Sequence, residues 1–339
     1  MPLPPYLHCL TLPTPFPVGP VNVYLAEGEA LTLIDTGPKA DLTRTALLAG
    51  LAALGYKPAA LRQIVLTHHH VDHIGLAGEL ATASGAAVIT HPQTAPWLAN
   101  YDDQRLRQEP FYRNLWVEAG APDDILAAMK TASDSAAHWT DGAAATQLVD
   151  EGDTLTLGNE PWQVFHTPGH AGSLICLWEP NTRTLLANDH LLRDISSNAI
   201  VEPPPNRHGP RPRRLLDYLH HMRRMAALNP AVALPGHGEP VREVAALVAR
   251  RARFHHRRAQ KILGIVSEAP RTLWELTQPL FPRLTRPLDF FLAMSEVLGH
   301  LDLLEADGLV APRPAGSVVR WTRVAAALDY TISHDPATA

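Results

Sequence analysis

The pattern of apolar and polar positions predicts alternating strands and helices over the first ninety residues. Apolar runs at residues 21–25 and 31–34 flank a Gly-containing turn, which indicates a β-hairpin. Leucines at helical spacing then predict a helix with Asp41 as its N-cap. Short apolar runs at 63–66 and 86–90 read as buried strands. This alternation is typical of an α/β layer structure.

Strand patterns return in the second half of the chain. Short turns connect most of them, so antiparallel pairs are expected here. The predicted strands are 153–157, 162–165, 174–178, 184–187 and 231–234, with a helix at 213–228 before the last of them.

Between Pro92 and Gln147 the strand rhythm stops, and the pattern is that of irregular helix rich in aromatic residues. An aromatic helical insertion can be a lid that shapes a pocket for an apolar substrate. It can equally be internal packing or a contact in a homodimer. The sequence leaves these interpretations open.

The last hundred residues differ from the rest. They contain three predicted helices and two short β-like pieces, and the third helix carries an apolar stripe closed by Gly308. Three helices and a small hairpin predict a winged-helix-like domain. The expected organisation is a catalytic domain at 1–240, with its helical insertion at about 92–147, and a linker helix and winged-helix-like domain at 241–339.

Metal-binding residue types concentrate directly after the strand at 63–66, in the stretch Thr67–His73. Side chains alternate in an extended backbone, so His68, His70 and Asp72 are expected on one face. A helix that begins near His73 would bring that imidazole beside Asp72. Imidazole and carboxylate ligands without a thiolate suit zinc, and also manganese or iron. The stretch therefore predicts a metal site that holds one ion or two.

Other polar residues suited to a metal site also follow strand ends. In open α/β sheets, ligands bind outside the carboxyl ends of the strands, so these positions are expected to converge. They are Asp35, His68, His170, Asp189 and His237.

These residues carry a family resemblance. Asp35-Thr36-Gly37, His68-x-His70-x-Asp72-His73, Thr167-Pro168-Gly169-His170, Asn188-Asp189 and Pro235-Gly236-His237-Gly238 resemble, in order, the five motifs of the metallo-β-lactamase superfamily. The C-terminal extension is similar to that of lactamase-beta-like members with a winged-helix tail, which include endoribonucleases and thioesterases. The resemblance implies a four-layer αββα sandwich with a dinuclear metal site at its edge.

The resemblance also implies a role for each residue. His68, His70 and His170 would bind the first metal, Asp72, His73 and His237 the second, and Asp189 would bridge both. Asp35 would orient a ligand imidazole by hydrogen bonding. Two Zn²⁺ ions, with manganese or iron as alternatives, would generate a bridging hydroxide as the nucleophile, and Asp72 would help to orient it.

Two residues after the bridging aspartate are further candidates. His190 adjoins Asp189 and is a candidate proton donor or anion contact. Arg193, in the following loop, is a candidate for binding a substrate carboxylate or phosphate, and a salt bridge with Asp194 is the alternative. His69 points away from the other ligands by alternation, and it and His166 are expected to be structural.

Composition places the chain among ordinary globular proteins, with 46% hydrophobic and 19% charged residues. The Pro-rich N-terminus resembles no signal peptide and no run approaches a membrane span, so a cytoplasmic protein without a membrane partner is expected. Cys9 and Cys176 form no paired motif and are expected to be reduced thiols.

The formal net charge of −5 hides an uneven distribution. Residues 207–261 contain thirteen Lys and Arg against three acids, which leaves 16 basic and 31 acidic residues in the rest of the chain. The basic segment can attract an anionic substrate, or it can be a solvated face.

The leading hypothesis is a metal-dependent hydrolase that acts on a small acyl substrate, a thioester, ester or lactone. The alternative is a phosphodiesterase, in practice an endoribonuclease on single-stranded RNA. The basic segment favours that alternative, whereas the acidic third helix at 289–307 opposes it. A third hypothesis is a winged-helix regulator that binds nucleic acid and carries a metal domain. A persulfide dioxygenase with a single iron also remains open.

Overall fold

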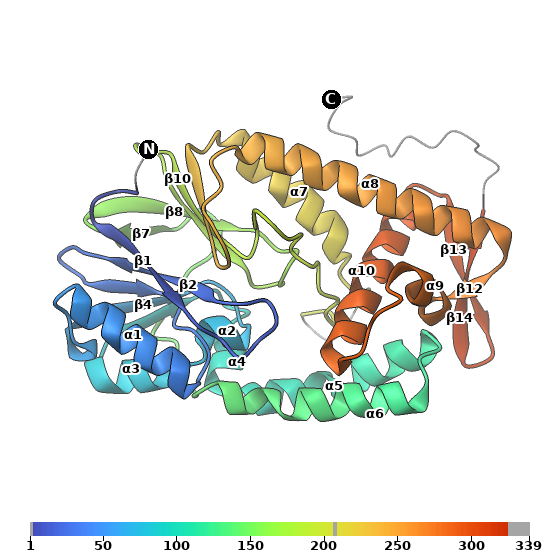
Figure 1. Ribbon diagram of the computed structural model, residues 1–339, viewed down its shortest axis with the longest axis horizontal. Helices are drawn as coiled ribbons and strands as arrows, with labels where there is room; N and C mark the ends of the chain where they lie inside the picture. Colours follow the sequence, from blue (N-terminus) through green and yellow to red (C-terminus); the bar gives the residue numbers. More distant parts are fainter. Residues whose placement is uncertain (1–2, 206–208, 325–339) are drawn as a thin grey trace. The chain divides into compact units, whose positions relative to one another are not determined.

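The computed structural model describes residues 3–205 and 209–324 of the chain. Within these residues the first sheet follows the chain order from β1 to β6 (Figure 1). The strands β1 to β3 are antiparallel and β3 to β6 are parallel. They span Leu7–Leu12 (β1), Val21–Ala26 (β2), Thr32–Ile34 (β3), Gln63–Leu66 (β4), Ala87–Thr90 (β5) and Gln147–Leu148 (β6). The predicted hairpin of β2 and β3 is confirmed.

Helices α1 (Asp41–Ala53) and α3 (Ala77–Ser84) pack on the first sheet, and the short helix η1 (Pro58–Ala60) contacts α3. Leu47 of α1 and Leu80 of α3 belong to one buried cluster with side chains of β2 to β5. The prediction of Asp41 as N-cap is wrong. Ala40 is the N-cap and makes no side-chain hydrogen bond, whereas Asp41 is the first helical residue, where its negative charge favours the helix dipole.

The second sheet has the order β11-β10-β9-β8-β7 among the described residues. Only β10 and β11 are parallel in it, and the other pairs are antiparallel as predicted. Its strands span Thr154–Leu157 (β7), Glu160–His166 (β8), Ile175–Glu179 (β9), Thr184–Asn188 (β10) and Val232–Pro235 (β11).

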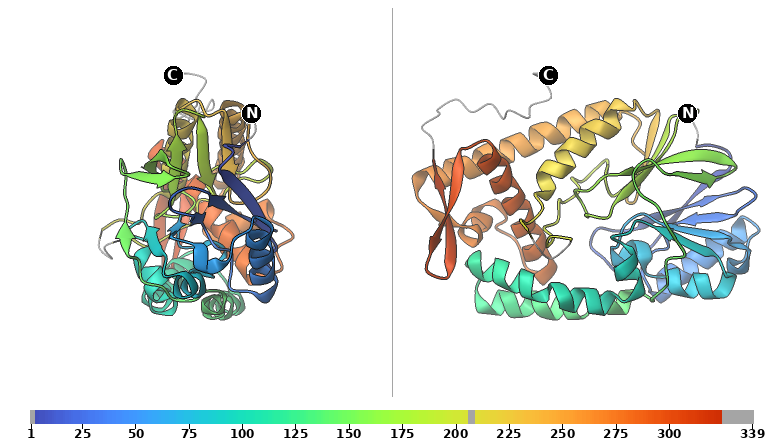
Figure 2. Two further views of the ribbon diagram at one scale, coloured as in Figure 1. Left: turned by 90° about the vertical axis from the view of Figure 1, so that its left-hand side faces the viewer. Right: turned by 180° about the vertical axis from the view of Figure 1, so that it is seen from behind.

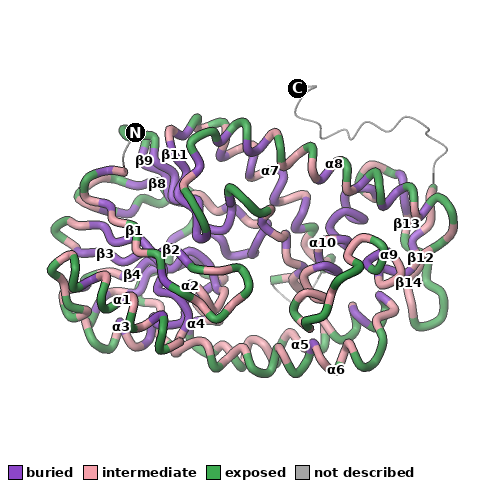
Figure 3. The backbone as a smooth tube through the Cα atoms, in the orientation of Figure 1, coloured by how far each residue is buried: buried purple, intermediate pink, exposed green. Residues whose placement is uncertain are grey.

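The two sheets share one apolar core. Ile34 and Val65 of the first sheet pack in the same buried cluster as Trp162 and Leu186 of the second. In Figure 3 the strands of both sheets are mostly buried, and most exposed residues lie in loops and on outer helix faces. Burial of this apolar surface stabilises the fold by about 25 cal/mol per Å². It also fixes the strand ends that carry the candidate ligands.

The predicted insertion contains α4 (Ala95–Ala99), α5 (Tyr101–Glu118), α6 (Asp123–Asp134) and the short helix η2 (Ala136–Trp139). Helices α5 and α6 run side by side (Figure 2), and Lys130 of α6 forms an ion pair of 3.5 Å with Glu109 of α5. The insertion is therefore more regular than its sequence pattern predicts.

The C-terminal part contains helices and a small antiparallel sheet of order β12-β14-β13 within the described residues. Thr272 and Glu275 form a capping box at the start of α9. The elements are α7 (Arg214–Ala227), α8 (Val244–Glu268), β12 (Arg271–Thr272), α9 (Leu273–Leu280), α10 (Pro287–Ala306), β13 (Val310–Ala315) and β14 (Val318–Arg323). The winged-helix interpretation of this part stays a prediction.

Helix α10 is a core helix. Its residues 293–304 are buried except Glu296, which is half-buried, and it contacts α6, α9 and β13. Its Asp302 carboxylate accepts hydrogen bonds from Arg211 at 2.6 and 2.8 Å. Near its start, Phe291 contacts Tyr112 and Trp116 of α5 at ring distances of 5.5 and 5.6 Å. These two aromatic residues of the insertion thus serve helix packing.

The chain forms two compact units, each built from three segments. The first contains residues up to 104, 135–197 and 221–245, and the second contains 105–134, 198–220 and the residues from 246 onward. The domain boundary expected near residue 240 stays a prediction. No described helix is long and apolar enough to cross a membrane.

Candidate metal centre

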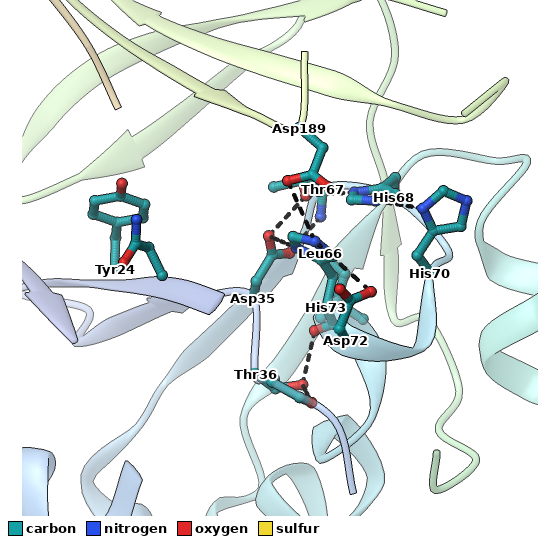
Figure 4. Close-up of polar contacts among 12 residues, drawn as sticks. Tyr24, Asp35, Thr36, Leu66, Thr67, His68, His70, Asp72, His73 and Asp189 are labelled. Atoms are coloured by element: carbon teal, nitrogen blue, oxygen red, sulfur yellow. Dashed lines mark hydrogen bonds and ion pairs between the residues drawn. The ribbon is translucent and has the colours of Figure 1, made fainter. Parts of the chain in front are cut away.

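The predicted ligand residues come together at strand ends of both large sheets. Figure 4 shows five of them, His68, His70, Asp72, His73 and Asp189. The helix α2 (Val71–Ile74) begins at Val71, so the extended alternation stops at His70 and this helix positions Asp72. The prediction that strand alternation places Asp72 on the face of His68 and His70 is therefore wrong, because Asp72 lies in a helix. Asp35 follows β3, His68 and His70 follow β4, Asp72 and His73 lie in α2, His170 follows β8, Asp189 follows β10 and His237 follows β11.

Three imidazoles form the first group of candidate ligands. His70 Nδ1 lies 3.0 Å from His68 Nε2 and 2.9 Å from His170 Nε2. His68 and His170 are buried, and His70 is half-buried. Three imidazole nitrogens that converge on one point can share a metal ion.

Asp72, His73 and His237 form a second group, and Asp189 lies between the two groups. His237 Nε2 is 3.3 Å from Asp72 Oδ2, and His73 Nε2 is 4.0 Å from Asp72 Oδ1. Asp189 reaches His73 and His237 at 3.6 Å each, and it reaches His170 of the first group at 3.4 Å. Its carboxylate is thus placed to contact ligands of both groups.

Hydrogen bonds on the far side of each ring orient the imidazoles of the second group. His237 Nδ1 donates to the Pro20 carbonyl at 2.8 Å, and His73 Nδ1 donates to Asp35 Oδ2 at 2.8 Å. Both bonds place a proton on Nδ1 and leave Nε2 facing Asp72 and Asp189, where it can bind a metal when it carries no proton. This is the arrangement that metal-binding histidines use in proteins.

Asp35 is fully buried and supports the site by hydrogen bonds. Its carboxylate accepts hydrogen bonds from Thr67 N at 2.9 Å, from Thr67 Oγ1 at 2.8 Å and from His73 (Figure 4). Its backbone has φ of 59°, a left-handed conformation that Asp tolerates better than most residues. One aspartate therefore ties the end of β3 to the strand and the helix that carry ligands.

The electrostatics of the two groups differ. Burial and the neighbouring imidazoles lower the pKa of His68 and His70 well below the usual value, so both are neutral. Burial also disfavours protonated His73, but the carboxylates of Asp189, Asp35 and Asp72 outweigh it and raise its pKa. Burial raises the pKa of Asp72, yet the adjacent imidazoles bring it to about 2. Concentrated negative charge in the second group attracts protons or a cation.

The donor atoms of the site fit a divalent metal. His73 Nε2, Asp189 Oδ1 and His237 Nε2 are buried and have no hydrogen-bond partner in the described part of the chain. Buried polar atoms are normally paired, so these atoms lack a partner that a cation would supply. The set contains imidazole and carboxylate and no thiolate, which suits zinc, manganese or iron.

His190 is fully buried next to Asp189. Burial lowers its pKa to about 3, opposed by a hydrogen bond to the backbone of His221. The ring is therefore neutral at neutral pH. Its predicted role as a proton donor stays a prediction, which this environment does not favour.

Arg193 lies on the surface and forms the salt bridge that the sequence offered as the alternative. Its guanidinium donates to both carboxylate oxygens of Asp194 at 3.0 to 3.2 Å. Contact of Arg193 with a substrate stays a prediction.

Several residues that hold the site lie far from it in sequence, and sequence reasoning missed them. Asn22 and Tyr24 of β2 donate to the Pro235 carbonyl at 3.1 and 2.7 Å and so fix the loop that carries His237. A Cβ on Gly236 would lie 2.2 Å from Asp189 Oδ1, so only glycine fits there. Apart from the Pro-Gly-His-Gly motif itself, no local signal identifies these contacts, because the partners are more than 200 residues apart.

Comparison with known proteins identifies relatives over most of the chain. The family model described as "Metallo-beta-lactamase superfamily" matches residues 16–237. A probable metallo-hydrolase of Bacillus subtilis, YqjP, is 37% identical over 310 residues, which cover 91% of this chain and 95% of the relative.

Solved structures show the same fold. A metallo-beta-lactamase family protein from Thermus thermophilus, TTHA1429, superposes with a TM-score of 0.76 at 27% identity, covering 95% of this chain and all of that one. A beta-lactamase domain protein from Burkholderia ambifaria gives a TM-score of 0.81 at 22% identity and covers 96% of this chain and 94% of its own.

Proposed function

The chain belongs to the metallo-β-lactamase superfamily, and from that premise we propose that it is a metal-dependent hydrolase with two metal ions. Members of this superfamily typically bind divalent metals, and the described residues include His and Asp groups that can hold them. The name of the Bacillus relative, probable metallo-hydrolase, supports hydrolysis as the reaction type.

One observation carries the proposal. Two groups of three ligands meet at the single carboxylate of Asp189, and three atoms at that meeting point are buried without a hydrogen-bond partner among the described residues. A structural role for these side chains would leave such atoms paired, because an unpaired buried polar group costs about 1–3 kcal/mol.

Each residue has a proposed task. His68, His70 and His170 hold one metal and Asp72, His73 and His237 hold the other, with Asp189 between them. When bound, two divalent cations supply a nucleophile by lowering the pKa of water to about 7 and act as Lewis acids toward the substrate. Asp35 keeps His73 in the metal-binding tautomer, and Asp72 is placed to orient the attacking group.

The proposed substrate is a small acyl compound, a thioester, ester or lactone. Trp97 supports this choice, because its ring stacks on His69 at 4.7 Å, and the His69 ring in turn lies 5.0 Å from that of His70. Helix α10 gives further support, since a buried helix cannot enter a nucleic-acid groove.

Cys9 and Cys176 are both free thiols, in line with the proposed cytoplasmic location. A homodimer stays a prediction.

The test combines metal analysis with a substrate panel. The purified protein is expected to contain about two equivalents of metal and to hydrolyse at least one of p-nitrophenyl esters, acyl-thioesters or lactones. Asp72→Ala should abolish this activity, whereas Asp124→Ala, which changes an exposed acid of α6, should not. Full activity in Asp72→Ala would refute the mechanism.

A second candidate function, hydrolysis of a phosphodiester such as single-stranded RNA, rests on one surface feature. Arg250, Arg253, Arg257 and Lys261 are exposed at helical spacing along α8. A row of cations attracts phosphate groups. Activity on bis-p-nitrophenyl phosphate or RNA, with no activity on the acyl panel, would select this function over the first.

A further inference from the structure

The loop at residues 167–174 carries one metal ligand, His170, between β8 and β9. It contains two glycines, which give its backbone conformational freedom, whereas Pro168 restricts only its own φ angle. Thr167 N donates to the Leu174 carbonyl at 2.8 Å and closes the base of the loop. A second internal bond runs from Leu174 N to the Ala171 carbonyl at 3.3 Å, and further contacts come from outside the loop.

One contact comes from His69, which lies between the ligands His68 and His70. His69 Nδ1 and Ser173 Oγ form a hydrogen bond of 3.0 Å, and both side chains are buried. The His69 ring stacks on Trp97 with centroids 4.7 Å apart and planes at 19°. The stack fixes the ring, and the ring holds the loop.

A second histidine, His166, also combines a hydrogen bond to the loop with a ring stack. His166 Nε2 donates to the Gly172 carbonyl at 2.7 Å, and the His166 ring stacks on His91 at 4.2 Å and 19°. His91 Nε2 in turn lies 3.2 Å from Asp150 Oδ1. His91 and Trp97 both belong to the segment that follows β5, so one segment supports both stacks.

His91, Asp150 and His166 are close enough together to hold a metal of their own, but their hydrogen bonds argue against it. Gln93 N donates to His91 Nδ1 at 3.2 Å, which leaves the ring proton on Nε2, where Asp150 accepts it. A metal on Nε2 would require the opposite tautomer. This group is therefore a support for the His166 ring.

We propose that His69 and His166 are positioning residues that hold the His170 loop in its metal-binding geometry, each by one hydrogen bond and one ring stack. The proposal rests on the proposed metal site. Neither residue belongs to the two proposed ligand groups. His166 acts on the three-histidine group through Gly172 of the loop, and His69 acts through Ser173 and also through its ring contact with His70 at 5.0 Å. Both hydrogen bonds end on the loop that carries His170, a residue of the three-histidine group.

The test separates the bond from the stack at each histidine. His69→Phe and His166→Phe keep an aromatic ring and lose the hydrogen bond. His69→Asn keeps a polar atom near the place of Nδ1, and His166→Gln keeps a donor near the place of Nε2. Ser173→Ala removes the same bond from the loop side without disturbing the Trp97 stack. His138→Phe, at an exposed histidine of the same unit, is the control.

The metal-free full-length variants are titrated with Co²⁺ by calorimetry and absorption spectroscopy. Both Phe variants and Ser173→Ala should weaken one of the two sites by about 10–100-fold, as loss of outer support does at metal sites. That site should be the one lost in His170→Ala. The Asn and Gln variants keep the hydrogen bond but lose the stack, so they should recover only part of the affinity, and the control should match the wild type.

Unchanged affinity in the Phe variants and Ser173→Ala, or equal weakening of both sites, would overturn the proposal, since a general loss of stability affects both sites alike. Two metals bound without hydrolysis of any substrate would count against the proposed function and leave this inference supported. A wild-type protein that binds no Co²⁺ would overturn both.

Discussion

Replacement of Asp35 tests how one buried carboxylate controls the site. In Asp35→Ala, the N–H and hydroxyl of Thr67 and the Nδ1–H of His73 lose their acceptor, at a cost of about 1–3 kcal/mol each. Alanine must also adopt φ of 59°, which costs about 1–2 kcal/mol more. The total is comparable with the whole stability of a typical protein, about 5–15 kcal/mol. We expect the alanine variant to fold poorly or not at all.

Asp35→Asn is the more informative change. Asparagine keeps the volume, tolerates the backbone conformation and retains an oxygen for Thr67 N. Its amide nitrogen replaces the oxygen that accepts from His73, so His73 Nδ1 must become the acceptor and the ring proton must move to Nε2. A protonated Nε2 cannot bind a metal. The variant should fold and lose about 10–100-fold in affinity at the site that contains His73.

The assay has two parts. Urea unfolding of the metal-free variants measures stability, and titration with Zn²⁺ by calorimetry measures the affinity of each site. Asp41→Asn is the control for metal affinity, because the Asp41 side chain is fully exposed and belongs to neither ligand group. Wild-type affinity at both sites in Asp35→Asn would refute the reasoning, since the tautomer of His73 would then not depend on Asp35.

Three further predictions follow from single contacts. Gly236→Ala should reduce metal content while circular dichroism stays unchanged, because the new Cβ would lie 2.2 Å from Asp189 Oδ1; full metal content would contradict this. The pKa of His73 is raised in the folded protein, and this stabilises the metal-free protein. The stabilisation is fully present at pH values below the unfolded-state pKa of about 6.5. It is lost as the pH rises through the folded-state pKa, so the urea midpoint should fall from pH 6 to pH 9. Arg211→Met should lower the free energy of unfolding by about 3–5 kcal/mol, because it leaves the carboxylate of Asp302 buried without its partner. Arg211→Met with Asp302→Asn should recover much of this loss in thermal unfolding, and an equal loss in the double variant would show that the pair is not responsible.

The fold was largely predictable because its local signals agree with its tertiary structure. The strand at 63–66 is predicted to the residue, and the strands of the second half lie where their apolar runs are. Where a predicted helix boundary is wrong, local hydrogen bonding sets the boundary. Asp41 has the residue type of an N-cap, but the helix begins one position earlier and leaves Ala40 in that place. The α/β fold and the family are confirmed.

The candidate site was predictable as a set of residues and less so as a geometry. Residue type and position after a strand were sufficient to select Asp35, His170, Asp189 and His237, and the structure brings them to one site. The roles of His170, Asp189 and His237 as metal ligands stay predictions for the titrations to test. The orientation of Asp72 depends on a helical turn of four residues, which a strand periodicity does not reveal.

The sequence alone determined which atoms can serve as ligands and at which strand ends they lie, because both depend on residue type and on local periodicity. Only the tertiary structure decided which ring nitrogen of each imidazole faces the centre, because that depends on partners distant in the chain, such as Pro20 for His237. The same holds for His69. Its predicted structural role depends on a hydrogen bond with Ser173, which lies 104 residues away in the chain. Hydrogen-bond partners of this kind are fixed by the packing of whole sheets, and a local pattern carries no information about them.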